Sequence, residues 1–192
     1  MSYNKDISEK YEKWVVRIIL KEKYYYILWG NDTTTFNHDA NVLVDENKRM
    51  LLFSNIKSLV DYIKKSDTVF DKKSSLSWVK KLKYPIRSSA TFNIDLLKNK
   101  RLSISTRESF NALISALDIP DDYAHCTNDK KILRTVLAPQ LRNLFDYYCN
   151  MYLWTPDKKL IAANSKKLNS KQVTFLLNKV YEQFLEKIAI VN

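Results

Sequence analysis

Residues 14–29 read WVVRIILKEKYYYILW, and their composition indicates two β-strands joined by a short polar turn. Every second residue of the first half is large and apolar, as expected where one face of a strand is buried. Residues 24–29 repeat the aromatic and β-branched content that favours strands, and the charged residues 21–23 separate the two runs. The stretch therefore predicts an antiparallel β-hairpin.

A second hairpin and a helix are predicted directly after it. Residues 42–44 and 50–53 are short apolar runs on either side of the polar stretch 45–49, which has the composition of a turn. Ser54 stands where a helix N-cap belongs, and Ile56, Leu59, Val60 and Ile63 follow at helical spacing. We therefore expect an amphipathic helix over residues 55–65 that packs on the sheet.

The remainder of the chain is expected to be mostly helical. Residues 75–83 suit a short helix that ends before Pro85, and residues 91–97 suit either a strand or a helical turn. Ser105 and Glu108 have the spacing of a capping box for a helix that ends before Pro120. Further helices are expected over residues 132–148, with a kink or a break at Pro139, and from a Ser170 cap through Ile188.

The predicted class is therefore α+β, with an N-terminal antiparallel sheet of about four strands followed by a mostly helical C-terminal half. The length of 192 residues suits one domain. Within it we distinguish a sheet-rich segment (1–65), a basic middle segment (66–104) and a helical segment (105–192).

Composition excludes several classes of protein. One glycine, Gly30, disfavours glycine-rich phosphate loops and dinucleotide fingerprints. The polar first residues do not resemble a secretory signal, and no apolar run is long enough for a membrane span. Two cysteines are too few for a disulfide framework. We expect a cytoplasmic protein without membrane contact.

Charge is concentrated in the middle of the chain. The net charge is +11, and residues 54–112 hold thirteen Lys or Arg against five Asp or Glu. We predict a partner-binding surface here, formed by Lys72, Lys73, Lys80, Lys81, Lys83, Tyr84 and Arg87. Lysines outnumber arginines by twenty-five to seven, which fits electrostatic attraction better than base-specific reading.

Two interpretations of this surface stay open. In a nucleic-acid-binding protein the lysines between residues 72 and 107 would neutralise phosphates, while Trp78 and Tyr84 would stack on bases. Alternatively a short helix has a buried stripe, and its lysines are only solvated; the stripe residues are Leu76, Trp78, Val79 and Leu82.

Catalytic and metal sites are expected to be absent. A zinc site from His125, Cys126 and Cys149 lacks the close-spaced ligand pairs typical of zinc, and a thiol–imidazole pair of Cys126 with His38 or His125 lacks an oxyanion-forming glycine nearby. Asp32 or Asp39 with Glu46 and Lys48 has the residues of a metal-dependent nuclease, but Glu46 and Lys48 fall in the predicted turn. We therefore expect no enzyme, no metal and no cofactor.

The order of these elements resembles that of immunity proteins from bacterial toxin–immunity pairs, including the contact-dependent growth inhibition group. The similarity lies in the two hairpins that lead into Ser54, and in the run LISALDIPDDY at residues 113–123. It implies a non-catalytic protein that binds one cognate toxin and blocks it, but it assigns no residues. Immunity proteins against nucleases are generally acidic, so a net charge of +11 suits a toxin with an acidic face.

We therefore predict a toxin-neutralising immunity protein, with a nucleic-acid-binding protein as the alternative. The sequence does not indicate an oligomeric state.

Overall fold

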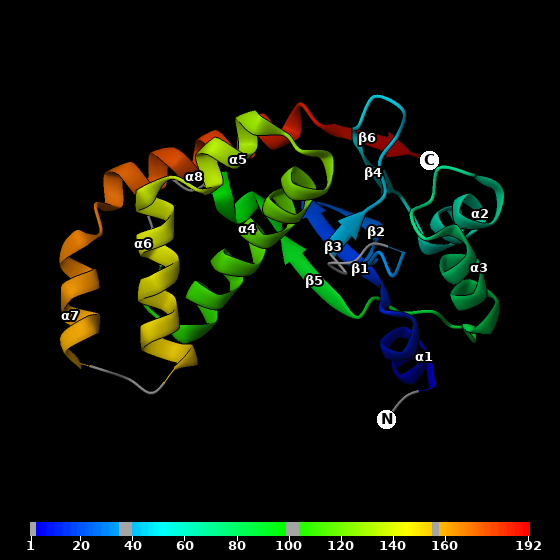
Figure 1. The fold of residues 1–192 in the computed structure, drawn as a ribbon, viewed down its shortest axis with the longest axis horizontal. Helices are drawn as coiled ribbons and strands as arrows, with labels where there is room; N and C mark the ends of the chain where they lie inside the picture. The colour runs from blue at the N-terminus through cyan, green and yellow to red at the C-terminus, as the bar shows by residue number, and fades with distance from the viewer. Residues whose placement is uncertain (1–2, 35–39, 99–103, 155–157) are drawn as a thin grey trace. The chain divides into compact units, whose positions relative to one another are not determined.

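The computed structural model describes residues 3–34, 40–98, 104–154 and 158–192, and its internal contacts form two compact units (Figure 1). Unit 1 contains Met1–Phe92 together with Lys187–Asn192, and unit 2 contains Asn93–Glu186. Unit 1 holds the sheet with three helices, and unit 2 is helical. The mixed α/β class, with a mostly N-terminal sheet and a helical C-terminal half, is confirmed. The single domain stays a prediction.

The first hairpin is confirmed. β1 (Lys13–Leu20) pairs antiparallel with β2 (Lys23–Asn31), and Trp14 lies opposite Trp29. The two-residue turn places Lys21 at φ 50° and Glu22 at φ 60°. Two positive φ values in succession are the conformation that matches the right-handed twist of a two-residue hairpin. The chain adopts this turn without glycine.

The second hairpin is present only in part. Its turn is confirmed, because Asp45 accepts hydrogen bonds from the amides of Asn47 and Arg49, and Val44 bridges Met50. However, β3 (Ala40–Val42) pairs with β2, and β4 (Met50–Phe53) also pairs with β2. β3 and β4 thus pair with the first hairpin more than with each other.

The sheet has six strands, not about four. Its order is β5-β1-β2-β4-β6, with β3 also on β2. β5 (Ala90–Asn93) lies beside β1, and β6 (Ile188–Val191) pairs parallel with β4. The prediction that Ile188 belongs to the last helix is therefore wrong. The amide of Met50 donates to the carbonyl of Lys187, and the amide of Ser54 donates to that of Val191, so β4 provides partners that local sequence does not reveal.

Three helices complete unit 1: α1 (Tyr3–Tyr11), α2 (Ile56–Lys65) and α3 (Lys72–Lys81). The N-cap of α2 is Asn55, whose side chain accepts from the Ser58 amide at 2.8 Å, and not Ser54 as predicted. α2 and α3 cover one face of the sheet. Their shared core includes Val15, Leu28, Leu51, Phe53, Leu59, Val60, Ile63, Trp78 and Val79.

Unit 2 contains a 3-10 turn and a series of helices. These are η1 (Ile94–Lys98), α4 (Arg107–Thr127), α5 (Lys130–Val136), α6 (Pro139–Tyr148), the π-helical η2 (Cys149–Leu153), α7 (Lys158–Lys167) and α8 (Ser170–Leu185). The break at Pro139 is confirmed, since this residue begins α6. The alternatives for residues 91–97 both occur, because β5 runs directly into η1.

Three predicted helix boundaries in unit 2 are wrong. α4 continues through Pro120 to Thr127; Ile119 and Tyr123 beside the proline are buried, and their packing offsets the lost backbone hydrogen bond. The capping box of α4 is formed by Thr106 and Ser109, and Asn169 caps α8. No helix within the described ranges is long and apolar enough to cross a membrane.

Candidate partner-binding pocket

A surface pocket of about 670 Å³ lies in unit 1 between α1, the start of β1, the end of α3 and residues 82–89. We call it the α1–α3 pocket. Its lining combines the aromatic side chains of Tyr3, Trp14 and Tyr84 with the cations Lys5, Lys83 and Arg87. A mainly concave site with few charged groups has the form of a binding site for a ligand or an anchoring side chain.

Two polar contacts hold the walls of the pocket together. The side chain of Asn4 on α1 donates to the carbonyl of Lys83 at 2.7 Å and accepts from its amide at 2.9 Å. At the base, the Trp78 indole nitrogen donates to the Ser8 hydroxyl at 3.2 Å. α1 is thereby tied both to α3 and to the segment that follows it.

Trp78 is a wall of the pocket and not a free platform. Its side chain is 0 % exposed and belongs to the core under the sheet. The interpretation of Trp78 as a buried helix residue is therefore confirmed, and it cannot stack on a base. Tyr84, in contrast, is 71 % exposed and remains available to a partner.

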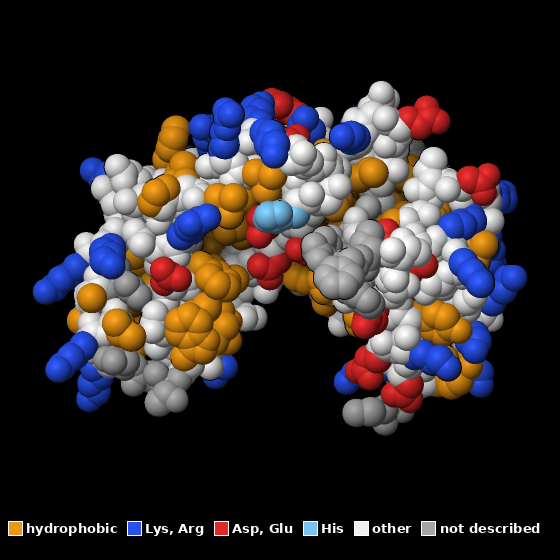
Figure 2. Space-filling view, in the orientation of Figure 1, with side chains coloured by type: hydrophobic (Ala, Val, Ile, Leu, Met, Phe, Trp, Pro, Cys, Tyr) orange, Lys and Arg blue, Asp and Glu red, His pale blue; other side chains and the backbone are white. Residues whose placement is uncertain are grey.

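The lining of the pocket is positive. Lys5, Lys83 and Arg87 line it, and no Asp or Glu is among its lining residues. The Lys83 ammonium lies 4.2 Å from the centre of the Tyr3 ring, within cation–π distance, and Lys5 forms an exposed pair with Glu9 at 3.7 Å. Figure 2 shows further Lys and Arg side chains over α2 and α3, and Asp and Glu side chains over α1.

The structure brings together three of the seven predicted surface residues. Lys83, Tyr84 and Arg87 line the α1–α3 pocket, whereas Lys73 and Lys80 are exposed on α3 outside it. The remaining two are engaged elsewhere, as follows.

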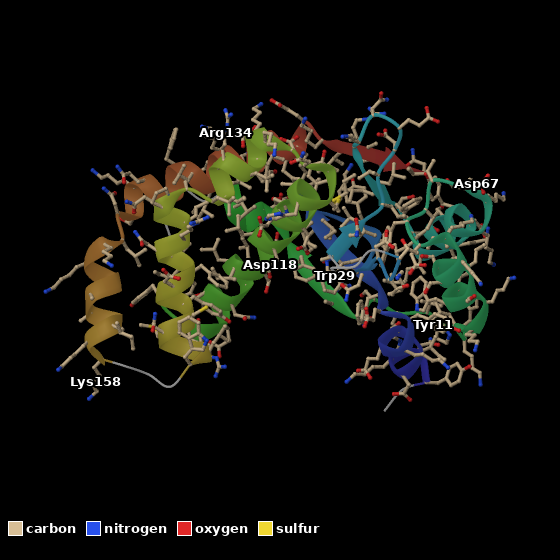
Figure 3. All side chains as sticks on the ribbon, viewed as in Figure 1. Tyr11, Trp29, Asp67, Asp118, Arg134 and Lys158 are labelled. Carbon is tan, nitrogen blue, oxygen red and sulfur yellow. The ribbon has the colours of Figure 1, made fainter. Side chains whose placement is uncertain are left out.

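Lys72 and Lys81 make contacts within unit 1. The Lys72 ammonium donates to the backbone carbonyls of Ile63, at 2.9 Å, and of Ser66, so it satisfies the C-terminal carbonyls of α2. Lys81 lies 5.7 Å from the ring centre of Tyr11, which Figure 3 labels at the end of α1. We therefore assign Lys72 a structural role.

Sequence reasoning missed the contribution of α1. Tyr3, Asn4 and Lys5 line the pocket, but residues 1–13 read as merely polar. The available signal is the spacing of Tyr3, Ile7 and Tyr11, which places three apolar residues on one helical face. It is weak because the rest of this helix is charged.

The alternative catalytic sites find no support in the described residues. No group of three or more His, Cys, Asp or Glu there could hold a metal ion. Cys149 is buried, and burial with the nearby Asp146 carboxylate raises the pKa of its thiol, which disfavours a thiolate. Cys126 is half-buried, and its thiol contacts the Tyr123 carbonyl at 3.4 Å.

The nuclease-like residues can be placed only in part. Glu46 and Lys48 lie in the exposed turn between β3 and β4, as predicted, and Asp32 accepts hydrogen bonds from the amide and hydroxyl of Thr34. His38 and Asp39 lie outside the described residues.

Comparison with known proteins identifies the fold alone. No protein-family model and no curated sequence matches the chain. The solved structure of the C-terminal domain of SatS, in complex with bromine, is similar with a TM-score of 0.62 and 11 % sequence identity, over 100 % of both chains. This similarity supports the arrangement of elements and says nothing of function.

Proposed function

We propose that the protein is a non-catalytic, protein-binding inhibitor of the immunity class, which neutralises a cognate toxin by binding an acidic face of it at the α1–α3 pocket. The observation that supports this most is the pocket itself, with three cations, four aromatic side chains and no carboxylate in its lining.

The chemistry of the pocket suits a protein partner. Tyrosine, tryptophan and arginine are the residues that most often dominate binding energy at protein interfaces, and Tyr84, Trp14 and Arg87 lie together here. An acidic residue of the partner could pair with a cation of the pocket, while an apolar residue beside it contacts an aromatic ring. Complementary charge would also raise the association rate.

Nucleic-acid binding is the alternative, and one observation favours it. Tyr84 is 71 % exposed beside Lys83 and Arg87, which is the arrangement of a base-stacking platform. The burial of Trp78 removes the second predicted platform, so we place this function behind protein binding.

The test is co-expression of the full chain with the reading frames that neighbour its gene. We expect the chain to form a stoichiometric complex with a neighbour-encoded protein and to relieve the toxicity of that protein. The complex should persist at moderate salt concentration. Tyr84→Ala should weaken the complex about 30-fold, as expected for the loss of about 2 kcal/mol at an interface hot spot. Arg87→Glu should weaken it further.

Matched controls distinguish a local effect from a general one. Tyr24→Ala removes another exposed tyrosine, 59 % exposed on β2, and Lys73→Glu reverses a charge on α3 outside the pocket; both should retain the complex. Copurifying 260 nm absorbance that nuclease removes, with an affinity that falls steeply with salt, would instead support nucleic-acid binding. Equal losses in the control variants would remove the pocket from the proposal.

A further inference from the structure

Unit 2 contains a second concave surface, unrelated to the α1–α3 pocket. It has a volume of about 410 Å³ and lies between α4, α5 and α6. We call it the α4–α6 hollow. Its apolar lining is formed by Ile114, Leu117, Val136, Leu137, Leu141 and Phe145.

Part of this apolar surface faces solvent. Leu137 is 42 % exposed and Phe145 is 48 % exposed, and both lie in the lining of the hollow. Large apolar side chains that gather around a concavity mark an interaction surface more often than single exposed ones do.

The charge of the hollow is opposite to that of the chain. Asp118, Asp121 and Asp146 line it against one cation, Arg142, in a protein of net charge +11. Among the described residues no ion pair within 4.0 Å involves Asp118, Asp146 or Arg142. Figure 3 shows Asp118 projecting from α4.

Two carboxyl groups of α4 that line the hollow, those of Asp118 and Asp121, have raised pKa values. Desolvation by the surrounding protein, together with the nearby carboxylates of Asp122 and Asp121, raises the pKa of Asp118 to about 6. Burial also raises the pKa of Asp121, although its Oδ1 lies 3.5 Å from the Nε2 of His125, which acts in the opposite direction. A positive group in the hollow would stabilise the ionised form of both carboxyls.

We propose that the α4–α6 hollow is a docking site for a basic amphipathic segment of a protein partner. An apolar side chain of that segment contacts Leu137 and Phe145, and a lysine or arginine of it reaches Asp118 and Asp121. Charge complementarity selects this occupant, because an acidic or neutral segment would leave the Asp118 carboxylate without a counter-ion. The geometry corresponds to an amphipathic helix laid in an apolar groove. This proposal is independent of the function proposed for unit 1.

The test uses the full chain and a defined probe. The probe is a capped, fourteen-residue helical peptide of leucine and lysine with one apolar face. Binding is measured by calorimetry, and the site is located by amide chemical shifts of the labelled protein. We expect the shifts to concentrate in residues 114–121 and 136–146. A peptide of the same composition in scrambled order, and one with glutamate in place of lysine, should bind at least tenfold more weakly.

Two matched pairs of variants complete the test. Asp118→Asn and Phe145→Ala should each raise the dissociation constant at least fivefold, while Asp67→Asn in unit 1 and Phe175→Ala, 66 % exposed on α8, should change it less than twofold. Equal loss in Asp67→Asn would show that the overall charge of the protein, and not the hollow, governs binding, and would overturn the proposal. Chemical shift changes outside the hollow, or equal binding of the scrambled peptide, would also overturn the proposal. The same holds if butylamine, a small amine without the apolar face of the peptide, binds as strongly as the peptide, or if a second copy of the chain occupies the hollow.

Discussion

Removing the buried ammonium of Lys13 should destabilise unit 1 more than any other single change of charge considered below. Its side chain is 0 % exposed, and Asp71, at 3.1 Å, is only 4 % exposed. The ammonium also donates to the carbonyl of Tyr11 at 3.3 Å and to that of Asn31. All of these partners lose their donor in Lys13→Met.

The magnitude follows from what the substitution leaves behind. Asp71 would retain only the hydroxyl of Thr33, at 2.6 Å, and its amide, at 3.3 Å, so a nearly buried carboxylate would lose its counter-ion. Breaking a buried pair from one side costs about 3–5 kcal/mol, a large part of a typical unfolding free energy of about 5–15 kcal/mol. In the double variant with Asp71→Asn we expect part of this loss to be recovered.

The assay is urea denaturation followed by tryptophan fluorescence. Trp14, Trp29 and Trp78 all belong to unit 1, while Trp154 of unit 2 is already 59 % exposed, so the signal reports mainly on unit 1. Lys57→Met is the control, because its pair with Asp61 is solvent-exposed and should contribute little to stability.

Acid provides a second check on the same pair. Hydrogen bonds from Thr33 and the Lys13 cation hold the pKa of Asp71 below its ordinary value against the opposing effect of burial. A carboxyl whose pKa is lowered by folding stabilises the fold above its unfolded pKa of about 3.9 and loses that contribution as pH falls through its folded pKa. A loss below about 1 kcal/mol in Lys13→Met, or strict additivity in the double variant, would refute this account.

Three further outcomes are expected. Gly30→Ala should lower the unfolding free energy by about 1–3 kcal/mol, because a Cβ there would lie 2.3 Å from the carbonyl oxygen of Glu12; an unchanged urea midpoint would contradict this. Asn55→Ala should lower the free energy of unfolding by about 1 kcal/mol and Ser54→Ala by much less, since Asn55 caps α2. A larger loss of thermal stability in Ser54→Ala than in Asn55→Ala would indicate that Ser54 is the cap. Folding raises the pKa of the Asp118 carboxyl from 3.8 to about 6, so ionisation of this group opposes folding: its effect is absent below the lower value and complete above the higher one. Asp118→Asn should therefore have a higher melting temperature than the wild type at pH 7.5, with the difference vanishing below about pH 3, and a constant difference would indicate another cause.

Local patterns predicted the first hairpin and the core of several helices. The alternation around Val16 and Ile18 is complete within eight residues, so no distant contact is needed to recognise β1. The break at Pro139 follows from the covalent geometry of proline alone. Such elements depend on interactions between residues that are close in sequence, and these interactions can be recognised in a single sequence.

The elements that were missed depend on distant partners. β6 is a strand because its residue Ile188 lies beside Met50, and the helical spacing of the apolar residues before it extends to Ile188, which hides the start of the strand. α4 crosses Pro120 because tertiary packing of Ile119 and Tyr123 outweighs a local cost. The α1–α3 pocket likewise joins residues near 3–15 with residues near 78–89, so its aromatic members could not be grouped before the fold was known.

The one glycine of the chain and its buried lysine are two parts of one arrangement. Gly30 lies opposite Lys13 across β1 and β2, and a Cβ on Gly30 would also meet the Lys13 side chain at 2.9 Å. The absence of a side chain thus leaves the space through which Lys13 reaches Asp71, the N-cap of α3. The same ammonium binds the carbonyl of Tyr11 at the end of α1. Since α1 and α3 form walls of the α1–α3 pocket, this buried arrangement sets their spacing, and the shape of the pocket depends on residues that a partner never contacts.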